Sequence, residues 1–237
     1  MKSFRFDRDT YMRGLGSAAV AFSGGVDVPE SEVFADNGIR QIIFEADVLN
    51  VEGVADNPVN RCYLCKRALF ENFLRLAEDK ILVEGSNMDD TGDYRPGMKA
   101  LAELEIKSPL REVGLRKAEI RALSRAMELP TADKPSMACL ATRFVYGERL
   151  TAEGLARVET AEEFLLSAGF NQVRVRVHGK IARIEISPAD FSKLMELRSD
   201  VVAKFKSLGF DYVTLDLEGF RSGSMNVGLR KASRPIN

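Results

Sequence analysis

The first half of the chain alternates between short apolar runs and segments with helical periodicity. Residues 17–25, 41–49 and 80–86 each have the pattern of a short buried strand, and residues 61–79 carry apolar side chains at helical spacing. Strands that alternate with helices in this way form a parallel sheet with helices on its faces. The pattern therefore predicts an α/β domain, which continues into a further helix over residues 115–127.

The second half of the chain has a different pattern. An amphipathic helix is predicted over residues 152–169, and residues 171–187 alternate strictly on both sides of a central His-Gly-Lys, as the strands of a hairpin do. A second helix over residues 188–208 leads to a strand over residues 212–219. These elements predict a compact α+β unit.

An irregular segment separates the two halves. Residues 128–144 contain two prolines and several small residues. We place the domain boundary shortly after this segment, so that residues 1–148 form the first domain and residues 149–237 the second. A chain of 237 residues, 45% of them hydrophobic, is long enough for two unequal domains.

The composition of the chain indicates where in the cell the protein is located and which kinds of molecule it binds. Charged residues make up 29% of the chain with a formal net charge of -1, so no overall excess of positive charge drives binding to nucleic acid or anionic lipid. Residues 1–14 lack the apolar core of a secretory signal, and no apolar run is long enough to cross a bilayer. We expect a cytoplasmic protein that binds small molecules and no membrane; a homo-oligomer is compatible with the sequence.

A glycine-rich turn follows the first predicted strand. Ser23, Gly24 and Gly25 would present unhindered backbone N–H groups, with a helix N-terminus behind them, to an anion such as pyrophosphate. An ordinary turn at the end of a strand has the same residues, so the motif alone leaves both interpretations open.

The three cysteines are candidate metal ligands. Cys62 and Cys65 are close enough in sequence to bind one metal centre, and Cys139 lies in a proline-flanked loop that could fold back onto them. Three thiolates fit zinc poorly, because four protein ligands close a structural zinc site and the only histidine, His178, belongs to the other domain. An iron–sulfur cluster on three cysteines leaves one iron open for a ligand such as sulfide. The alternative is that all three are small apolar core residues.

Acidic residues gather after the third predicted strand. This segment contains Asn87, Asp89, Asp90 and Asp93, at the carboxyl edge where open α/β sheets bind ligands. Such a cluster could hold Mg²⁺ near phosphate groups. A solvated turn with helix-capping aspartates is the alternative.

Charged residues alternate along both strands of the predicted hairpin. Arg174 and Arg176 on one strand share a face with Arg183 and Glu185 on the other, because each pair keeps one orientation at a period of two. Guanidinium groups there would bind carboxylates or a phosphate bidentately. The alternative is a solvated sheet face with a cross-strand ion pair.

Several motifs in the chain agree with one known family. They read "SGGVD", "NPVNRCYLCK", "GSNMDDTGDYRPG", "KSPLREVGLRKAEIRALS", "KPSMACLATRFVYG" and "VRVRVHGKIARIEI". Together with the tail "DLEGFRSGSMN" they closely resemble the LarE family of PP-loop sulfur transferases, which build the nickel-pincer nucleotide cofactor of lactate racemase. The resemblance implies a PP-loop sheet of the adenine nucleotide alpha hydrolase type, with helices on both faces, and a smaller α+β domain that handles the substrate.

The resemblance also implies a reaction. ATP, with Mg²⁺, would adenylate a carboxylate of pyridinium-3,5-biscarboxylic acid mononucleotide, sulfur would attack the acyl carbon, and AMP would leave a thiocarboxylate. Family members take the sulfur either from one sacrificial cysteine or from sulfide on a 4Fe-4S cluster held by three cysteines. Cys62, Cys65 and Cys139 match the three cluster positions, which favours the cluster route with an external sulfide donor. Without a cluster, Cys139 is the sacrificial candidate.

Further residues match the family residue by residue. The pyrophosphate loop is matched by Ser23, Gly24, Gly25 and Asp27, and Asn87, Asp89 and Asp90 complete the expected nucleotide site. Polar positions of the substrate-handling domain are matched by Glu162, Arg174, Arg176 and Glu185. We assign the two arginines to the phosphate and carboxylates of the substrate.

The chain departs from the family directly after the loop. The family continues from this loop into a helix and a second strand, whereas here Val28 and Pro29 follow Asp27 at once. Either residues are missing from the given chain or the deletion is real and cripples the ATP site. The first explanation is favoured, because loss of a central strand should cost more than the roughly 5–15 kcal/mol of stability that a domain has.

Two rival functions fit parts of the pattern. A tRNA-thiolating enzyme also uses two cysteines at this spacing and a third, but it should carry a basic surface or an RNA-binding domain. A zinc-stabilised or nucleotide-binding module without catalytic activity would keep the cysteines and a degenerate loop. The near-neutral charge of this chain disfavours the first rival.

Overall fold

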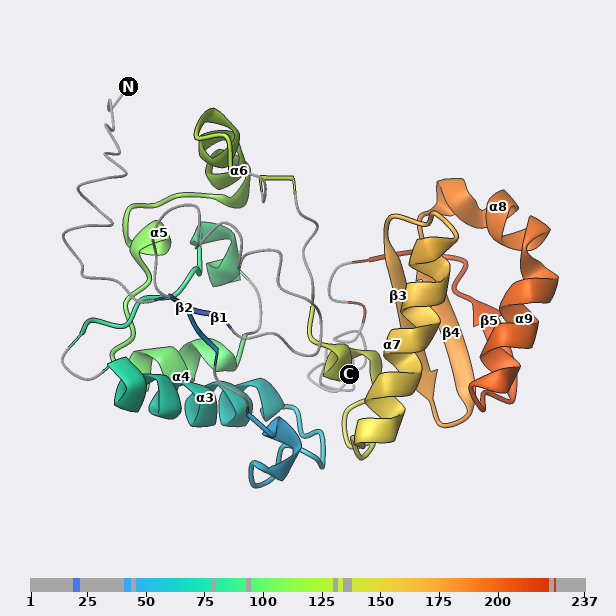
Figure 1. The fold of residues 1–237 in the computed structure, drawn as a ribbon, viewed down its shortest axis with the longest axis horizontal. Coiled ribbons are helices and arrows are strands. Elements are labelled where there is room, and N and C mark those ends of the chain that lie inside the picture. The colour runs from blue at the N-terminus through green and yellow to red at the C-terminus, as the bar shows by residue number, and fades with distance from the viewer. Residues whose placement is uncertain are drawn as a thin grey trace, which may run out of the picture. The chain divides into compact units, whose positions relative to one another are not determined.

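The structure is a computed structural model, and it describes residues 19–21, 41–43, 46–77, 80–92, 95–129, 132–133, 138–221 and 224. The chain divides into two compact units, which are described separately below (Figure 1). The first unit consists of residues 1–51 and 60–137, and the second of residues 52–59 and 138–237. The boundary expected from the sequence, between residues 148 and 149, stays a prediction.

The first unit is a mixture of strands and helices. Its described elements are β1 (Ala19–Ala21), β2 (Gln41–Ile43), the 3₁₀ helix η1 (Val48–Asn50), α3 (Arg61–Ala77), the 3₁₀ helix η2 (Met88–Gly92), α4 (Gly97–Glu103), α5 (Pro109–Glu112) and α6 (Lys117–Ala126). Strands β1 and β2 pair in parallel, with Ala19 opposite Gln41. Parts of the first two predicted strands are therefore present and pair in parallel, whereas the end of the second predicted range, Val48 and Leu49, lies in η1.

The third predicted strand, residues 80–86, is reduced to one contact. A single parallel bridge joins Val83 to Lys107. The side chain of Ile81 is 67% exposed, and that of Val83 is also exposed. Among the described residues, this bridge is the only strand-like pairing of the segment. A short apolar run in the sequence does not show whether other strands lie beside it, so the prediction of a full strand was wrong.

Helices α3 and α4 pack against each other at their N-terminal ends. A Cβ atom on Gly97 would lie 2.8 Å from Cδ of Lys66 and 3.3 Å from the carbonyl oxygen of Cys62. Because glycine lacks that atom, the first turn of α4 approaches the cysteine-bearing turn of α3 closely. Farther along, the apolar side chains of Leu69 and Phe73 are buried.

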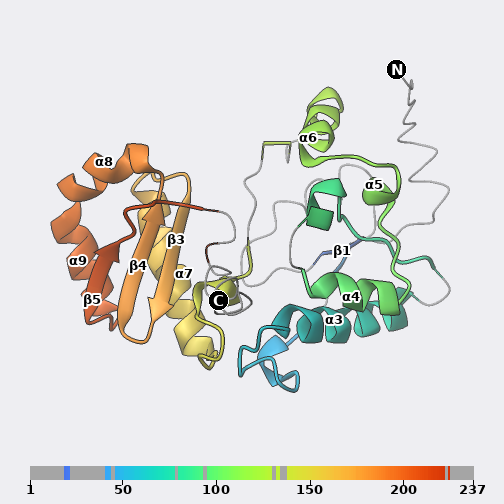
Figure 2. The same ribbon diagram turned by 180° about the vertical axis from the view of Figure 1, so that it is seen from behind.

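The second unit is built on a three-stranded sheet. Its elements are η3 (Leu140–Arg143), α7 (Ala152–Ser167), β3 (Val173–His178), β4 (Ile181–Ile186), η4 (Pro188–Asp190), α8 (Phe191–Glu196), α9 (Arg198–Ser207) and β5 (Tyr212–Leu215). The strand order is β3-β4-β5, with β3 and β4 antiparallel and β4 and β5 parallel. Helix α7 packs on β3 and α9 packs on β5, as Figure 2 shows from the side of the sheet.

The hairpin alternates between an apolar face and a charged face, as predicted. Val173, Val175 and Val177 lie opposite Ile186, Ile184 and Ala182, and all six side chains are at most 2% exposed. Helix α7 adds Val158, Ala161 and Leu165 to this core at helical spacing. The two-residue turn places Gly179 at a φ of 59°, which a type II′ hairpin turn needs at its first position.

The predicted helix over residues 188–208 is three shorter elements. A 3₁₀ turn begins it, α8 ends at Glu196, and α9 starts at Arg198. The buried residues Leu194, Val201 and Phe205 keep helical spacing across the break. Periodicity alone therefore could not reveal the break at residue 197.

Residues 52–59 belong to the second unit because backbone contacts tie them to it. The amide of Gly147 donates to the carbonyl of Asn57 at 2.8 Å, and the amide of Leu150 donates to the carbonyl of Ala55 at 2.7 Å. The side-chain amide of Asn57 donates to the carbonyl of Val145 at 2.8 Å. This long-range pairing was not predicted.

Candidate functional site

The charged face of the hairpin is the most elaborate polar region of the second unit. Arg174 lies opposite Glu185 and Arg176 lies opposite Arg183, so the four side chains share one face as predicted. The centre of this face is not solvated, since Glu185 is 0% exposed and Arg176 is 5% exposed. Burial of charge on this scale requires that each group has close partners of opposite charge or polarity.

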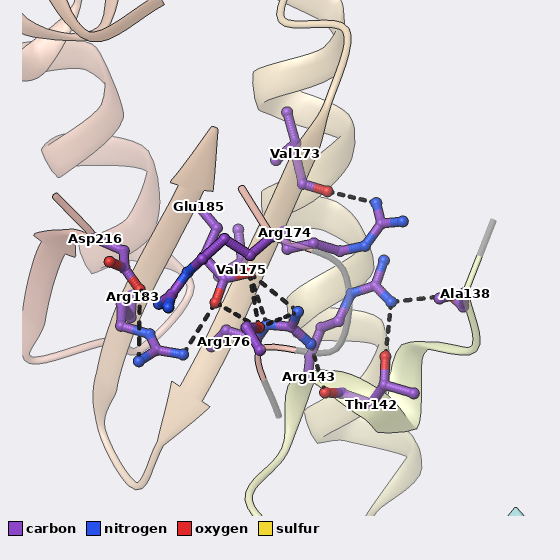
Figure 3. Close-up of polar contacts among 12 residues, drawn as sticks. Ala138, Thr142, Arg143, Val173, Arg174, Val175, Arg176, Arg183, Glu185 and Asp216 are labelled. Atoms are coloured by element: carbon purple, nitrogen blue, oxygen red, sulfur yellow. Dashed lines mark hydrogen bonds and ion pairs between the residues drawn. The ribbon is translucent and has the colours of Figure 1, made fainter. Parts of the chain in front are cut away.

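Arg176 is bound on every side of its guanidinium group (Figure 3). Its Nε donates to Oε2 of Glu185 at 3.1 Å, and its Nη2 lies 3.0 Å from the same oxygen. Its Nη1 donates to the carbonyl of Thr142 at 2.7 Å, and its Nη2 also donates to Oγ of Ser224 at 2.8 Å. A substrate anion at Arg176 would have to share this group with its protein partners.

Glu185 is the centre of the network. Its Oε1 accepts from Nη2 of Arg183 at 3.0 Å and from the hydroxyl of Ser224 at 3.0 Å. Arg183 extends the network to Oδ2 of Asp216, 3.6 Å away. Asp216 also pairs with Arg221 at 3.4 Å, so the ion pairs cross the full width of the sheet.

Arg174 has a different environment from Arg176. Its Nη1 donates to the carbonyl of Val173 at 2.6 Å, and its guanidinium lies 5.2 Å from the centre of the Phe220 ring. Burial lowers the pKa of Arg174, and the positive charge of Arg143 lowers it further. The attraction of Glu162 and Glu185 acts in the opposite direction and does not offset these effects.

Arg143 is a functional candidate that the sequence did not single out. Its Nε donates to Oε1 of Glu162 at 2.8 Å, and its Nη2 donates to Oε2 at 2.7 Å, which makes a bidentate buried pair. Glu162 was predicted as a substrate-handling residue, and in the structure it binds this arginine. The signal that could have found Arg143 is its position four residues after Cys139, within the motif "KPSMACLATRFVYG".

Cys139 lies at the start of η3, and its side chain is exposed. Its carbonyl accepts hydrogen bonds from the amide of Thr142 at 2.9 Å, from Oγ1 of Thr142 at 2.8 Å and from Nη1 of Arg143 at 3.2 Å. The backbone of this cysteine is therefore fixed while its thiol stays accessible to a reagent or ligand.

Cys62 and Cys65 lie near the start of α3, about one helical turn apart. The thiol of Cys62 is exposed and that of Cys65 is partly exposed. Nη2 of the buried Arg61 lies 3.9 Å from Sγ of Cys62. The alternative that the cysteines are apolar core residues does not fit Cys62 or Cys139, because both are exposed.

A polar cluster follows the same helix face. Glu84 accepts hydrogen bonds from the hydroxyls of Ser86, at 2.7 Å, and Ser108. Nζ of Lys66, next to Cys65 in sequence, lies 4.0 Å from Glu84. These contacts hold the segment after the Val83 bridge against α3.

The acidic segment after this bridge is engaged in local contacts. Oδ2 of Asp89 accepts the amide of Lys117 at 2.9 Å, and Oδ1 accepts from Arg116 at 3.1 Å, which caps the start of α6. Asp90 accepts the amide of Asn87 at 2.9 Å and pairs with Arg95 at 2.6 Å. These are the contacts of the capping alternative, and the predicted role of Asn87, Asp89 and Asp90 in binding Mg²⁺ stays a prediction.

Several predicted site residues lie outside the described part of the chain. They are Ser23, Gly24, Gly25, Asp27 and Asp93. Among the described residues, no group of three or more His, Cys, Asp or Glu side chains is arranged to hold a metal ion. Cys62 and Cys65 belong to the first unit and Cys139 to the second, so the three-cysteine site stays a prediction.

His178, the only histidine of the sequence, is the last residue of β3 and lies on the same face as Arg174 and Arg176. Partial burial lowers the pKa of His178, and the positive charge of Arg183 lowers it further. The carboxylates of Glu148 and Glu185 act in the opposite direction. The imidazole is therefore kept in its neutral form to a lower pH than usual.

In the part of the chain that the structure describes, none of the helices has both the length and the apolar character needed to span a bilayer.

No protein-family model matches the sequence. Two uncharacterised proteins are similar to it. The first, from Synechocystis, is 41% identical over 82% of this chain and 74% of its own length. The second, from Methanocaldococcus jannaschii, is 35% identical over 74% of this chain and 69% of its own length.

A third relative has a named activity. The chain is 34% identical to the pyridinium-3,5-bisthiocarboxylic acid mononucleotide synthase of Lactiplantibacillus plantarum, over 93% of each chain. The alignment spans 256 positions, more than the 237 residues of this chain, so the relative has residues that this chain lacks. Identity at this level over nearly the whole of both proteins shows common ancestry, and the chain belongs to the LarE family.

Proposed function

We propose that the protein is an ATP-dependent sulfur transferase that converts pyridinium-3,5-biscarboxylic acid mononucleotide to the thiocarboxylate, a step in the synthesis of a nickel-pincer nucleotide. The observation that carries the proposal is the 34% identity, over 93% of both chains, to a synthase of the bisthiocarboxylic acid mononucleotide. In this reaction a substrate carboxylate attacks the α-phosphorus of ATP and pyrophosphate leaves. Sulfide then attacks the acyl carbon, and AMP leaves with the displaced oxygen.

The nucleotide would bind to the first unit. We infer a PP-loop fold there, in which Ser23, Gly24, Gly25 and Asp27 hold the pyrophosphate, while Asn87, Asp89 and Asp90 lie near Mg²⁺. The parallel pairing of β1 and β2 supports this inference, because the loop would follow directly after β1. The acidic residues would exchange their present contacts with Arg95 and Arg116 for the metal and its water shell.

The substrate would bind along the charged face of the second unit. Arg174 is the first candidate for its phosphate or carboxylates, since its partly buried guanidinium shares this face with Arg176 and feels the positive charge of Arg143. Arg176 and Glu185 form the buried base of that face, and Glu162 holds Arg143 beside it. Arg176 would then contact the substrate through N–H groups shared with its protein partners.

The residues present fit an iron–sulfur cluster in their chemistry. Thiolates are the usual ligands of such clusters, and the thiols of Cys62 and Cys139 are exposed while that of Cys65 is partly exposed. Cys62, Cys65 and Cys139 would hold a 4Fe-4S cluster. When bound, this cluster would carry the sulfide on the iron that has no protein ligand.

The proposal is tested by a reaction with a mass readout. Protein purified without oxygen is incubated with Mg-ATP, sulfide and the biscarboxylate mononucleotide, and the nucleotide is examined by mass spectrometry. We expect the mass to rise by the difference between sulfur and oxygen, with AMP and pyrophosphate formed in equal amounts. Unchanged substrate mass in the presence of bound ATP would overturn the proposed reaction.

Two controls separate the sources of sulfur. The variants Cys62→Ala and Cys65→Ala should lose iron and activity together if the cluster delivers the sulfide. If instead they keep activity, and one sulfur is lost from the protein per product, Cys139 is the donor. The rival function as a tRNA-thiolating enzyme is tested directly by measuring the binding of tRNA against salt concentration.

A further inference from the structure

The second unit contains a connection between Cys139 and the hairpin that the proposed function does not require by itself. We propose that Arg143 is a positioning residue for Cys139, with Glu162 as its anchor, so that the cysteine is held at a fixed place relative to the arginine face of β3. This inference rests on the proposed function only for the use of Cys139 in sulfur transfer. The connection itself is made of contacts within one unit.

One edge of the Arg143 guanidinium is used for anchoring. Nε and Nη2 form two parallel hydrogen bonds to the Glu162 carboxylate, at 2.8 Å and 2.7 Å. Arg143 is 3% exposed and Glu162 is 7% exposed. A planar fork bound bidentately in a buried site cannot rotate, so the remaining nitrogen has a defined direction.

The remaining nitrogen of Arg143 is bound to the cysteine segment. Nη1 donates to the carbonyl of Ala138 at 2.9 Å, to the carbonyl of Cys139 at 3.2 Å and to Oγ1 of Thr142 at 3.0 Å. Thr142 in turn donates its own amide and hydroxyl to the Cys139 carbonyl. The carbonyl groups on both sides of the cysteine Cα atom are therefore held by one side chain.

Two further contacts tie this segment to β3 (Figure 3). Oε1 of Glu162 accepts the backbone amide of Val175 at 2.8 Å. The carbonyl of Thr142 accepts Nη1 of Arg176 at 2.7 Å. Val175 lies between Arg174 and Arg176 in β3. The contacts of the cysteine segment therefore reach the same stretch of backbone that carries the two arginines of the charged face.

A structural role alone would need only part of this arrangement. A buried ion pair is weak evidence for a stabilising role, because apolar side chains of similar volume often serve as well. Arg143 uses one edge for the pair and the other for the cysteine segment, which a lysine cannot do with its single ammonium group. The contacts of Nη1 with the cysteine segment, which the ion pair with Glu162 does not need, are therefore the evidence for a positioning role.

The inference is tested by hydrogen exchange with mass spectrometry on protein without ATP, substrate or metal. We compare Arg143→Lys and Arg143→Ala with Arg149→Ala, whose arginine is exposed and paired with Asp56 in the same unit. We expect the Thr142 amide, which bonds to Cys139, to exchange at least about tenfold faster in both Arg143 variants, as loss of one charge-assisted hydrogen bond implies. Helix α7 should also exchange faster in Arg143→Ala, because Glu162 is left buried without its cation, whereas exchange in β4 should rise much less than at Thr142.

Added ethylguanidinium should restore slow exchange in Arg143→Ala but leave Arg143→Lys unchanged, because only the first leaves room for it. Unchanged exchange at Thr142, or equally faster exchange throughout the second unit, would overturn the inference. The second result would make Arg143 a structural residue only.

Kinetics then separate positioning from substrate binding. If the transfer reaction is detected, Arg143→Lys should lower kcat and leave KM for the mononucleotide close to that of the parent. A raised KM with unchanged kcat would show that Arg143 binds substrate and would overturn the positioning role. If no transfer reaction is found, the exchange result still stands on its own.

Discussion

The two units each contain a close ion pair, and the two pairs differ in how far their side chains are exposed to solvent. In the first unit Arg125 and Asp133 approach to 2.5 Å, yet their side chains are 54% and 72% exposed. In the second unit Arg176 and Glu185 are 3.0 Å apart with 6% and 0% exposed. The shorter pair contributes less, because water screens exposed charges, whereas a buried charge without its partner has no compensation. Burial and the number of partners, more than distance, show which charges the fold depends on.

The strongest way to test this difference is to remove the centre of the buried network. Glu185→Ala should lower the free energy of unfolding by about 3–5 kcal/mol, because the buried guanidinium of Arg176 would lose its carboxylate and the half-buried Arg183 would keep only Asp216. The change is measured by urea unfolding followed by circular dichroism. Hydrogen exchange should show the loss in β3 and β4 and leave α3 unaffected.

The matched variant Glu185→Gln keeps the volume and one acceptor oxygen, so it should lose less stability than Glu185→Ala. Equal losses in the two variants would mean that packing and not charge is responsible for the effect.

A smaller effect is expected at the start of α6 in the first unit. Asp89→Ala removes the carboxylate that accepts the Lys117 amide, and loss of a capping interaction of this kind costs about 1 kcal/mol. The loss should be confined to α6 in hydrogen exchange. A loss as large as that of Glu185→Ala would mean that Asp89 has partners beyond the cap.

The lone histidine gives a pH-dependent test of the charged face. The folded pKa of His178 lies below its ordinary value of 6.5, because of burial first and Arg183 second. The folded protein therefore binds fewer protons than the unfolded chain in this range. Stability is full above the unfolded pKa and falls as the pH drops through the folded pKa.

This dependence is measured in two ways. The His178 ring is the only imidazole in the chain, so its proton resonances give the pKa directly in an NMR titration. His178→Asn should remove that part of the pH dependence of unfolding. A pKa above 6.5 would contradict the described environment.

The smallest effect should come from the exposed pair of the first unit. Asp133→Asn should leave unfolding unchanged within error, although the pair has the shorter distance. A clear loss of stability would show that proximity can compensate for exposure, and the comparison between the units would fail.

The hairpin was predictable from the sequence because its pattern has one dominant period. Alternation placed Val173, Val175 and Val177 on one face and the arginines on the other, and the register confirms this. The same pattern could not show that the charged face is buried, because residues far along the chain cover it. Ser224 and Thr142 bind Arg176 from 48 and 34 residues away.

The first unit was predicted less completely. Residues 80–86 have the composition of a strand, but strand formation depends on neighbours that a single apolar run does not specify. The short helices α4 and α5 were not predicted, since four to seven residues carry too little periodicity. Spacing marked the cysteines as candidate metal ligands, which stays a prediction, whereas Arg143 could not be singled out, because its contacts include a carboxylate 19 residues away in another helix.

The hydroxyl of Ser224 lies within the buried network, where it bonds to both Arg176 and Glu185. A shortened version of this protein for crystallisation or fusion therefore has to retain residue 224. Truncation before that position would remove a hydrogen-bond partner of Arg176 and Glu185 from the interior of the second unit. The hairpin would be destabilised, although it lies about 40 residues or more away in the sequence.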